Sequence, residues 1–441
     1  MKKILYTLAA LIAFSSFAKA QESVYPAKDY KGLLFITNGT VHVGNGTVIE
    51  NATIKINNGK IVEVGTNIAV PADNVQVFSA KGKQVYPGLI LSSSDLGLKE
   101  ISNGVRASND YSEIGDINSD VRSITAYNAD SRVINVLKGN GILLASVNPE
   151  GGSISGSSSV VQLDAWNWED ASYKMDAGIH LNMPSFIARF GRRGGGGGFG
   201  RPGAGEAVDP TKQALEKVEE LKNFFREAKA YNQESNHTNT NLKLAAVKGL
   251  FDKKQKLYVH ADQVKQMLVA IDFVKEFGFD VVVVGGSESF QIADLLKGSN
   301  IAVILSEEHA LPATEDDDTD QPYKTPAVLQ KAGVLYSLND NSDNTRYRNV
   351  SYNAGTAATY GLSKEEALSA ITLNAAKILG VDDKTGSIEV GKDANIIVSA
   401  GDILDMKSST VEMAFIQGRK VSLENKQTQL YDRYKSKYGI K

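Results

Sequence analysis

Histidine and carboxylate side chains are the groups in this sequence best suited to chemistry near neutral pH. The chain has five histidines, of which His42 falls among predicted β-hairpins and His237 in a polar connector. Imidazole and carboxylate groups bind divalent metals or exchange protons with water, so the other histidines and several acids are candidates for a metal-binding or acid–base site. These candidates are His180, His260 and His309, with the carboxylates Asp95, Glu307 and Asp340.

Residues 257–380 predict the framework that must position these side chains. Short apolar runs at 257–260, 281–284, 301–305 and 334–338 alternate with amphipathic helix patterns, which is typical of parallel strands covered by helices. Several consecutive units of this kind favour a closed barrel with functional groups at the strand ends. An open doubly wound sheet is the alternative, although no glycine-rich nucleotide fingerprint follows any of the runs.

The sequence segments before and after the barrel region show a different pattern. Residues 33–85 alternate apolar and polar positions and are broken by Asn-Gly and Gly-Lys, as in antiparallel hairpins. The same pattern returns at residues 386–392 and 413–420. We therefore predict a small β-sandwich from residues 30–86 and 383–425, and an α/β barrel of the TIM (β/α)8 type from residues 87–382.

Four segments of the predicted barrel have distinctive compositions. Residues 191–205 are nearly all glycine with three arginines, which predicts a mobile surface loop, with binding of an anionic partner as the alternative. Residues 209–231 predict a charged amphipathic helix, and a capping box of Ser363 and Glu366 starts a later one. The acidic run at 315–320 predicts a solvated loop, with binding of a cation or a basic substrate as the alternative.

The first twenty residues predict export. Lys2 and Lys3 precede an apolar run that ends in Ala18-Lys19-Ala20, as in a signal peptide cut after Ala20. No later run reaches the 18 or so apolar residues of a membrane span. The chain has no cysteine for disulfides, and its net charge of −3 predicts no nucleic-acid partner. We expect a periplasmic or extracellular protein that acts on a small-molecule or peptide-like substrate.

Three motifs occur in order along the chain. They are Pro87-Gly88-Leu89-Ile90, the segment 372–380 that reads Thr-Leu-Asn-Ala-Ala-Lys-Ile-Leu-Gly, and the segment 386–394 that reads Gly-Ser-Ile-Glu-Val-Gly-Lys-Asp-Ala. Together they resemble the amidohydrolase superfamily, and especially its imidazolonepropionase-like branch. The resemblance covers both flanks and the outer thirds of the barrel, whereas residues 107–256 match poorly and indicate a divergent subgroup.

The resemblance implies a hydrolase with one or two divalent metals, zinc or manganese, that lower the pKa of the attacking water. Ser93 and Asp95 stand at the positions of the family's His-X-His pair, so that motif is absent, and Gly285-Gly286 replaces a histidine of the sixth strand. His260 matches a ligand at the end of the fifth strand. Asp340 matches the aspartate that binds metal and acts as general base. The expected site therefore has His260, Asp340 and Asp95 on a reduced or absent metal, Asp340 as the catalytic base, and His180, Glu307 and His309 near the substrate.

Three functions remain open on these residues. The first is an exported amidohydrolase that hydrolyses a C–N bond in a cyclic amide or peptide-like substrate. The second is a catalytically inactive homologue that binds a ligand or an active relative. The sequence Trp-Asn-Trp-Glu at 166–169 would suit a ligand platform, although a buried tryptophan pair is the ordinary interpretation. The third is metal-free catalysis by Asp95 and Asp340 across the barrel. Homo-oligomers, in particular dimers, are common in the resembled family, but nothing in the sequence indicates the oligomeric state of this chain.

Overall fold

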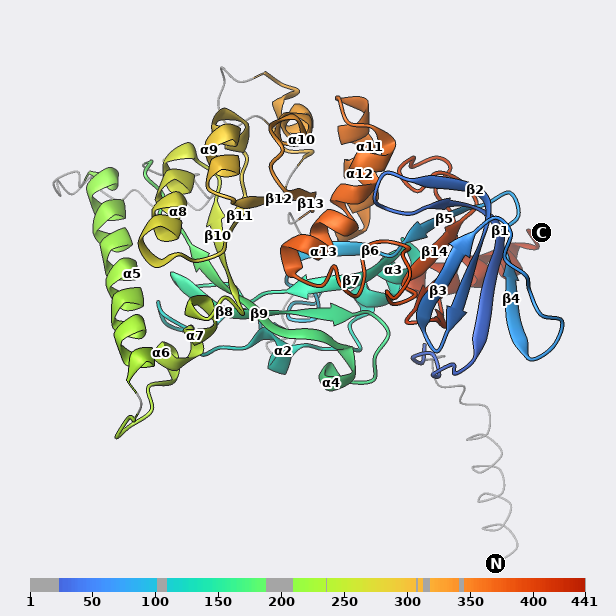
Figure 1. Cartoon of the computed structure of the whole chain (residues 1–441), viewed down its shortest axis with the longest axis horizontal. Coiled ribbons are helices and arrows are strands. Elements are labelled where there is room, and N and C mark those ends of the chain that lie inside the picture. Colours follow the sequence, from blue (N-terminus) through green and yellow to red (C-terminus); the bar gives the residue numbers. More distant parts are fainter. Residues whose placement is uncertain are drawn as a thin grey trace, which may run out of the picture.

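The computed structural model describes residues 24–100, 109–187, 209–234, 236–306, 308–311, 318–340 and 345–440. The described residues form two eight-stranded sheets that lie side by side. Helix α5 lies at the end of the molecule away from the sheet that contains β1 (Figure 1). The predicted signal peptide, the glycine-rich loop 191–205 and the first part of the acidic run lie outside the described residues. None of the helices in the described ranges combines the length and apolar character that crossing a bilayer requires.

The sheet that contains strands β6 to β13 forms the barrel. Its strands follow the order β13-β12-β11-β10-β9-β8-β7-β6, and their inner and outer faces belong to one continuous apolar core. The segment from β10 to β13 alternates strands and helices, so the prediction for residues 257–338 is confirmed. The strands are β6 (Leu89–Ser94), β7 (Ile142–Val147), β8 (Ile154–Gln162), β9 (Ser172–Asn182), β10 (Lys256–Ala261), β11 (Val281–Gly285), β12 (Ala302–Leu305) and β13 (Tyr336–Leu338).

One strand breaks the predicted (β/α)8 pattern. β8 runs antiparallel to both β7 and β9, whereas the other neighbouring strands are parallel. Only residues 148–153 connect β7 to β8, and Gly151 and Gly152 adopt φ angles of +87° and +66° there. A parallel crossover needs a dozen or more residues, so this short turn forces the chain to reverse. The prediction of a regular barrel is therefore wrong between residues 148 and 171.

Side chains rather than a strand ladder join β6 to β13. Ser337 Oγ donates to Ser92 Oγ over 2.9 Å. Asn339 Oδ1 accepts from the backbone N–H of Ser92 at 3.2 Å, and its Nδ2 donates to the carbonyl of Ser93 at 2.7 Å. The amide of Asn339 thus satisfies backbone groups of β6 that a ladder would otherwise pair.

The end of α13 closes the barrel at the amino ends of its strands. Lys256 Nζ donates to the carbonyl of Ile378 at 2.7 Å, and Lys174 Nζ donates to those of Leu379 and Gly380 at 3.2 and 3.1 Å. Cations are favourable at a helix C-terminus, where carbonyl groups lack partners. Because this end is filled, the polar groups at the carboxyl ends of the strands face the opposite mouth.

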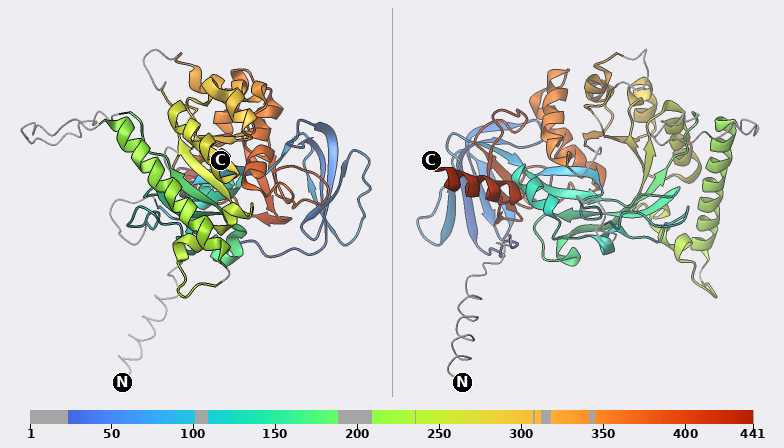
Figure 2. Two further views of the ribbon diagram at one scale, coloured as in Figure 1. Left: turned by 60° about the vertical axis from the view of Figure 1, so that its left-hand side comes forward. Right: turned by 180° about the vertical axis from the view of Figure 1, so that it is seen from behind.

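Helices surround the barrel, and the predicted helix at 209–231 and the capping box of Ser363 and Glu366 are both confirmed. Viewed from behind, α14 lies on the outside of the molecule, where it contacts α3 (Figure 2). The helices are α2 (Ser123–Ala126), α3 (Arg132–Gly139), α4 (Trp168–Ala171), α5 (Pro210–Gln233), α6 (Leu242–Ala246), α7 (Lys248–Phe251), α8 (Val264–Phe277), α9 (Ala293–Gly298), α10 (Gln321–Ala332), α11 (Val350–Thr359), α12 (Lys364–Ala370), α13 (Leu373–Leu379) and α14 (Lys426–Tyr438).

The second sheet contains strands from both ends of the chain. β14 pairs with β5 in antiparallel register, which joins the C-terminal strands to the N-terminal hairpins in a single eight-stranded sheet with its own apolar cluster. The limits 30–86 and 383–425 of a separate domain remain a prediction. The strands are β1 (Leu33–His42), β2 (Val48–Asn57), β3 (Lys60–Gly65), β4 (Val75–Ser79), β5 (Gln84–Pro87), β14 (Ile396–Ser399), β15 (Val411–Ile416) and β16 (Arg419–Val421).

His42 links this sheet to a barrel helix. Its Nδ1 lies 2.6 Å from Glu365 Oε1 on α12, its Nε2 lies 2.9 Å from Gln84 Oε1 on β5, and its ring stacks on Tyr86. Burial by itself lowers the pKa of His42, but the hydrogen bonds to Glu365 and Gln84 and the charge of Glu365 outweigh it and raise the pKa above 6.5.

The contribution of His42 to stability should therefore depend on pH. A raised folded-state pKa stabilises the fold fully below the unfolded value, and this stabilisation is lost as the pH rises through the folded pKa. We expect the stability advantage of the wild type over His42→Gln to be larger at pH 6 than at pH 9, as measured by denaturant unfolding. An equal difference at the two values would show that His42 contributes by packing alone.

Candidate active site

Two histidines meet near the carboxyl ends of neighbouring strands. His180 of β9 stands opposite Tyr258 of β10 in the strand register, and His260 follows two residues later on the same face. His180 Nδ1 lies 2.9 Å from His260 Nε2, within hydrogen-bonding distance. The ring of His180 also stacks on that of Tyr258, with centroids 4.9 Å apart and 7° between the planes. The three rings form one cluster.

Both imidazoles of this pair are neutral at pH 7. Burial, with a smaller effect of His260, holds the pKa of His180 well below 6.5, and desolvation lowers the pKa of His260 to about 4. One neutral ring nitrogen can then donate the shared hydrogen bond while the other accepts it. His180 Nε2 is buried and has no hydrogen-bond partner in the described part of the chain. Such an atom costs about 1–3 kcal/mol until a polar group satisfies it.

Asp95 is held in a separate network beyond the end of β6. Its carboxylate accepts from the hydroxyl of Tyr347 and lies 3.5 Å from the ammonium of Lys99. Its backbone N–H donates to the same Tyr347 oxygen over 3.1 Å. Ser93, two residues earlier, donates to Asn148 Oδ1 at 3.3 Å. The two positions matched to the His-X-His pair therefore have protein partners of their own.

Asp340 follows β13 and contacts a third set of groups. Asn353 Nδ2 of α11 donates to Asp340 Oδ2 over 3.3 Å, and Arg346 Nε lies 3.8 Å from the same oxygen. The exposed His309 lies beside α11 as well, where its Nε2 is 2.9 Å from Thr356 Oγ1. Burial lowers the pKa of His309, although the charge of Asp340 opposes this effect. Glu307 lies outside the described residues.

These side chains do not gather into a metal-ligand set. Within the described ranges, no group of three or more histidine, aspartate or glutamate side chains is arranged to hold a metal ion. β11 and β12 lie between β10, which carries His260, and β13, which Asp340 follows. The predicted ligands His260, Asp340 and Asp95 are thus distributed over three networks. The donors that the structure describes do not fit the zinc or manganese that the family resemblance implies.

Zinc should therefore not stabilise the protein. A ligand present at 100 times its dissociation constant stabilises a fold by about 2.7 kcal/mol, which thermal unfolding detects readily. We expect the unfolding midpoint in excess zinc to equal that in EDTA within experimental error. If zinc instead raises the unfolding midpoint of the wild type but not that of Asp340→Asn, the protein has a metal site that includes this carboxylate.

The chain is similar to known proteins in sequence and in fold. Residues 218–421 match the amidohydrolase family. An amidohydrolase structure from Thermotoga maritima MSB8 is 25% identical and superposes with a TM-score of 0.73, covering 88% of this chain and 99% of that one. Somewhat less than half of the chain is thus similar to the amidohydrolase family, and the fold is similar to that of an amidohydrolase over most of its length.

The similarity to curated relatives extends over a smaller region. The chain is 31% identical over 176 residues to an imidazolonepropionase of Picrophilus torridus, and 34% identical over 125 residues to one of Shewanella frigidimarina. These matches cover 38% and 28% of this chain, and 42% and 27% of the two relatives. The chain thus spans less than half the length of either relative. Both relatives carry the name of the imidazolonepropionase-like branch that the chain's motifs resemble.

Sequence reasoning named most of these residues but not their partners. Tyr258, Tyr347 and Asn353 were not recognised, because an aromatic or amide residue in a buried strand or helix looks the same whether it packs or supports a polar group. The contact of His180 with His260 was also missed. The sequence did show that each histidine lies near the end of an apolar run. Only the strand order makes the two histidines neighbours.

Proposed function

We propose that this protein hydrolyses a C–N bond of a cyclic amide or a peptide-like substrate at the carboxyl-end mouth of its barrel. The observation that carries the proposal is the 2.9 Å contact between His180 and His260, with one buried nitrogen left without a partner among the described residues. Similarity to the amidohydrolase family supports a hydrolytic reaction, and the name of the imidazolonepropionase relatives makes a ring amide the first substrate class to test.

His260 is the candidate general base because it is the more exposed ring of the pair. It would take a proton from water as the water oxygen bonds to the amide carbon. The resulting imidazolium would return that proton to the leaving nitrogen as the C–N bond breaks, so the protons balance. His180 would orient the ring through their 2.9 Å contact. Asp340 and Arg346, from a different part of the mouth, would bind polar groups of the substrate.

The pH profile tests this assignment. A general base acts when deprotonated, and desolvation lowers the pKa of His260 to about 4. We therefore expect kcat/KM to be constant between about pH 6 and 8 and to fall only as the pH approaches that pKa. Circular dichroism at each pH would confirm that the fold persists. An acidic limb near pH 6.5 would indicate a more solvated base than His260.

The direct experiment uses the purified mature protein and a panel of ring amides, N-acyl amino acids and dipeptides. Mass spectrometry would detect the paired acid and amine products. Turnover of at least one class at a rate proportional to enzyme concentration supports the proposal. A folded protein that turns over none of the three classes contradicts it.

A second candidate is a catalytically inactive subunit that binds a ligand or an active homologue. It is favoured by the networks around Ser93 and Asp95, which employ these groups in structural contacts. Affinity purification from the source cell separates the candidates, since a silent subunit should recover a partner in fixed stoichiometry. An active hydrolase that purifies as a monomer or homo-oligomer would exclude this function.

We also propose that the protein is exported and works in the periplasm or outside the cell. The charged and apolar pattern of residues 1–20 supports this localisation. Mass spectrometry of the secreted chain should find its N-terminus at Gln21, and an intact Met1 on protein from the cytoplasm would contradict it.

A further inference from the structure

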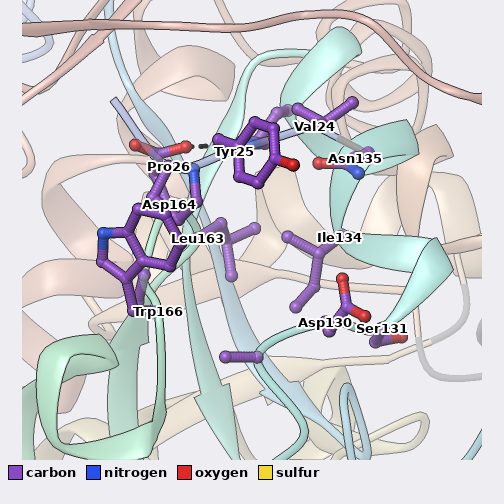
Figure 3. A pocket seen from close by; sticks show the side chains of 13 residues that line it. Val24, Tyr25, Pro26, Asp130, Ser131, Ile134, Asn135, Leu163, Asp164 and Trp166 are labelled. Atoms are coloured by element: carbon purple, nitrogen blue, oxygen red, sulfur yellow. Dashed lines mark hydrogen bonds and ion pairs between the residues drawn. The ribbon is translucent and has the colours of Figure 1, made fainter. Parts of the chain in front are cut away.

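A cavity of about 330 Å³ lies on the flank of the barrel. Figure 3 shows Tyr25 and Trp166 on one side of it, with Ile134, Asn135 and Ser131 on the other. Because β8 runs antiparallel, its last residue, Gln162, stands beside Leu144 near the start of β7. The cavity that follows β8 is therefore near the amino ends of the strands, on the side away from His180 and His260. Its volume falls within the range of small-molecule sites.

One wall of the cavity is a pair of exposed aromatic rings. Tyr25 is 69% exposed and Trp166 is 65% exposed, and their ring centroids are 6.1 Å apart. The backbone beneath each ring is fixed, since Trp166 N–H donates to Asp170 Oδ2 at 3.3 Å and Ala27 N–H donates to Asp164 Oδ2 at 2.8 Å. The expected burial of the tryptophan pair is thus wrong for Trp166. Ordered rings of this kind gain about 0.5–1.5 kcal/mol by stacking on another ring.

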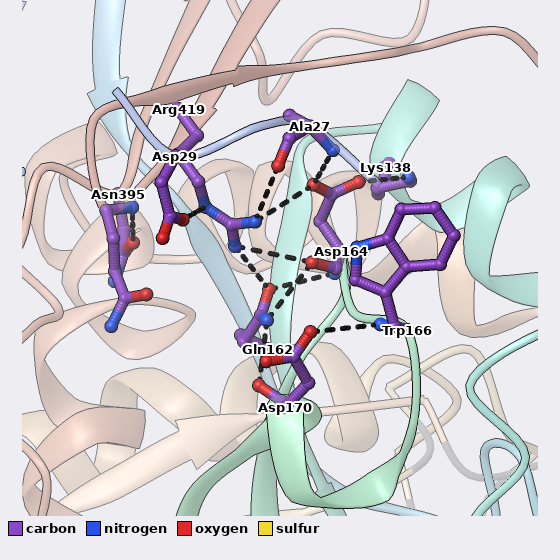
Figure 4. Close-up of polar contacts among 10 residues, drawn as sticks. Ala27, Asp29, Lys138, Gln162, Asp164, Trp166, Asp170, Asn395 and Arg419 are labelled. Atoms are coloured by element: carbon purple, nitrogen blue, oxygen red, sulfur yellow. Dashed lines mark hydrogen bonds and ion pairs between the residues drawn. The ribbon is translucent and has the colours of Figure 1, made fainter. Parts of the chain in front are cut away.

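Beside the cavity, two buried cations contact one buried carboxylate (Figure 4). Lys138 is 3% exposed and lies 2.9 Å from Asp164 Oδ1, while Arg419 Nη1 lies 3.6 Å from Asp164 Oδ2. Two cations therefore share one buried carboxylate. The next acid, Asp29, has a side chain that is 83% exposed, and it reaches only Arg419, at 3.9 Å.

Lys138 has unused hydrogen-bonding capacity. An ammonium can donate three hydrogen bonds, but Asp164 is the only acceptor that Lys138 reaches among the described residues. Of the residues that line the cavity, Lys138 is also the only cation. Two acids line the cavity as well: Asp164, which pairs with Lys138, and Asp130, which precedes the N-cap of α3.

We propose that this cavity binds an aromatic carboxylate, such as the carboxyl-terminal residue of a short peptide or an N-acylated aromatic amino acid. The carboxylate would accept hydrogen bonds from Lys138, and the aromatic ring would stack on Trp166 and Tyr25. A buried anion requires a charged partner, and this cluster supplies one in advance. The site is separate from the His180–His260 pair and does not depend on hydrolytic activity.

Calorimetric titration of the mature protein tests the site with two probes, N-acetylphenylalanine and its amide. The probes differ only in the charge of the carboxyl group. We expect the acid to bind with at least tenfold higher affinity than the amide. Trp166→Ala should weaken binding of the acid at least tenfold, whereas Tyr431→Ala, which removes a ring that is equally exposed on α14, should leave it unchanged.

Lys138→Met should abolish the difference between the acid and the amide. If this variant fails to fold, the comparison of the two probes on the wild type still decides the role of the charge. Equal affinity of the wild type for both probes would overturn the assignment of a carboxylate to Lys138. Absence of binding, or unchanged binding in Trp166→Ala, would overturn the site itself.

Discussion

Replacing His260 with glutamine should lower kcat/KM for C–N hydrolysis by about 100- to 10,000-fold, the usual contribution of a general acid–base residue. A glutamine amide can still form a hydrogen bond to His180 Nδ1 in place of the 2.9 Å contact. It cannot accept a proton from water and return it to a leaving nitrogen. The loss should therefore appear mainly in kcat, while the unfolding midpoint changes little.

His237→Gln is the matched control. His237 stacks on Tyr231 with ring centroids 3.7 Å apart, in the connector that follows α5, so its loss should leave kcat/KM unchanged. Asp340→Asn tests the alternative that Asp340 is the general base. If Asp340→Asn abolishes turnover while a folded His260→Gln retains it, the base is Asp340, as the family resemblance implied. Loss in His260→Gln alone assigns the proton transfer to the histidine pair.

Asp164→Asn should lower the stability of this protein strongly. The carboxylate of Asp164 is fully buried and holds Lys138 at 2.9 Å, the backbone N–H of Ala27 at 2.8 Å and Arg419 at 3.6 Å. Removing one charge of a buried pair costs about 3–5 kcal/mol, because the other charge stays buried without compensation. We expect a correspondingly lower denaturation midpoint in guanidinium chloride.

Asp280→Asn is the control for this stability change. Its carboxylate lies 3.0 Å from Lys253 Nζ, but both side chains are about half exposed, so the expected cost is about 0–1 kcal/mol. The double variant Asp164→Asn with Lys138→Met should recover part of the stability, since it removes a cation along with its partner. A loss in Asp164→Asn no greater than that in Asp280→Asn would show that water already screens the cluster.

The later half of the barrel could be predicted because its signals are local. The apolar runs at 257–260 and 281–284 and the helix between them are each specified by residues that are neighbours in sequence. The capping box of Ser363 and Glu366 is local as well. The antiparallel course of β8 could not be read in the same way, because an apolar run has the same pattern in either direction. Gly151-Gly152 was the only indication of a reversal.

By itself the sequence determined the resemblance to a family, the alternation of late strands and helices, and the set of polar side chains available for chemistry. It did not determine which of them meet. His180 and His260 are 80 positions apart, and their contact depends on β9 lying beside β10 in one register. Asp95, Asp340 and Lys138 acquired their partners in the same manner. Tertiary structure decides such contacts because strand order and side-chain direction arise only when the whole core packs.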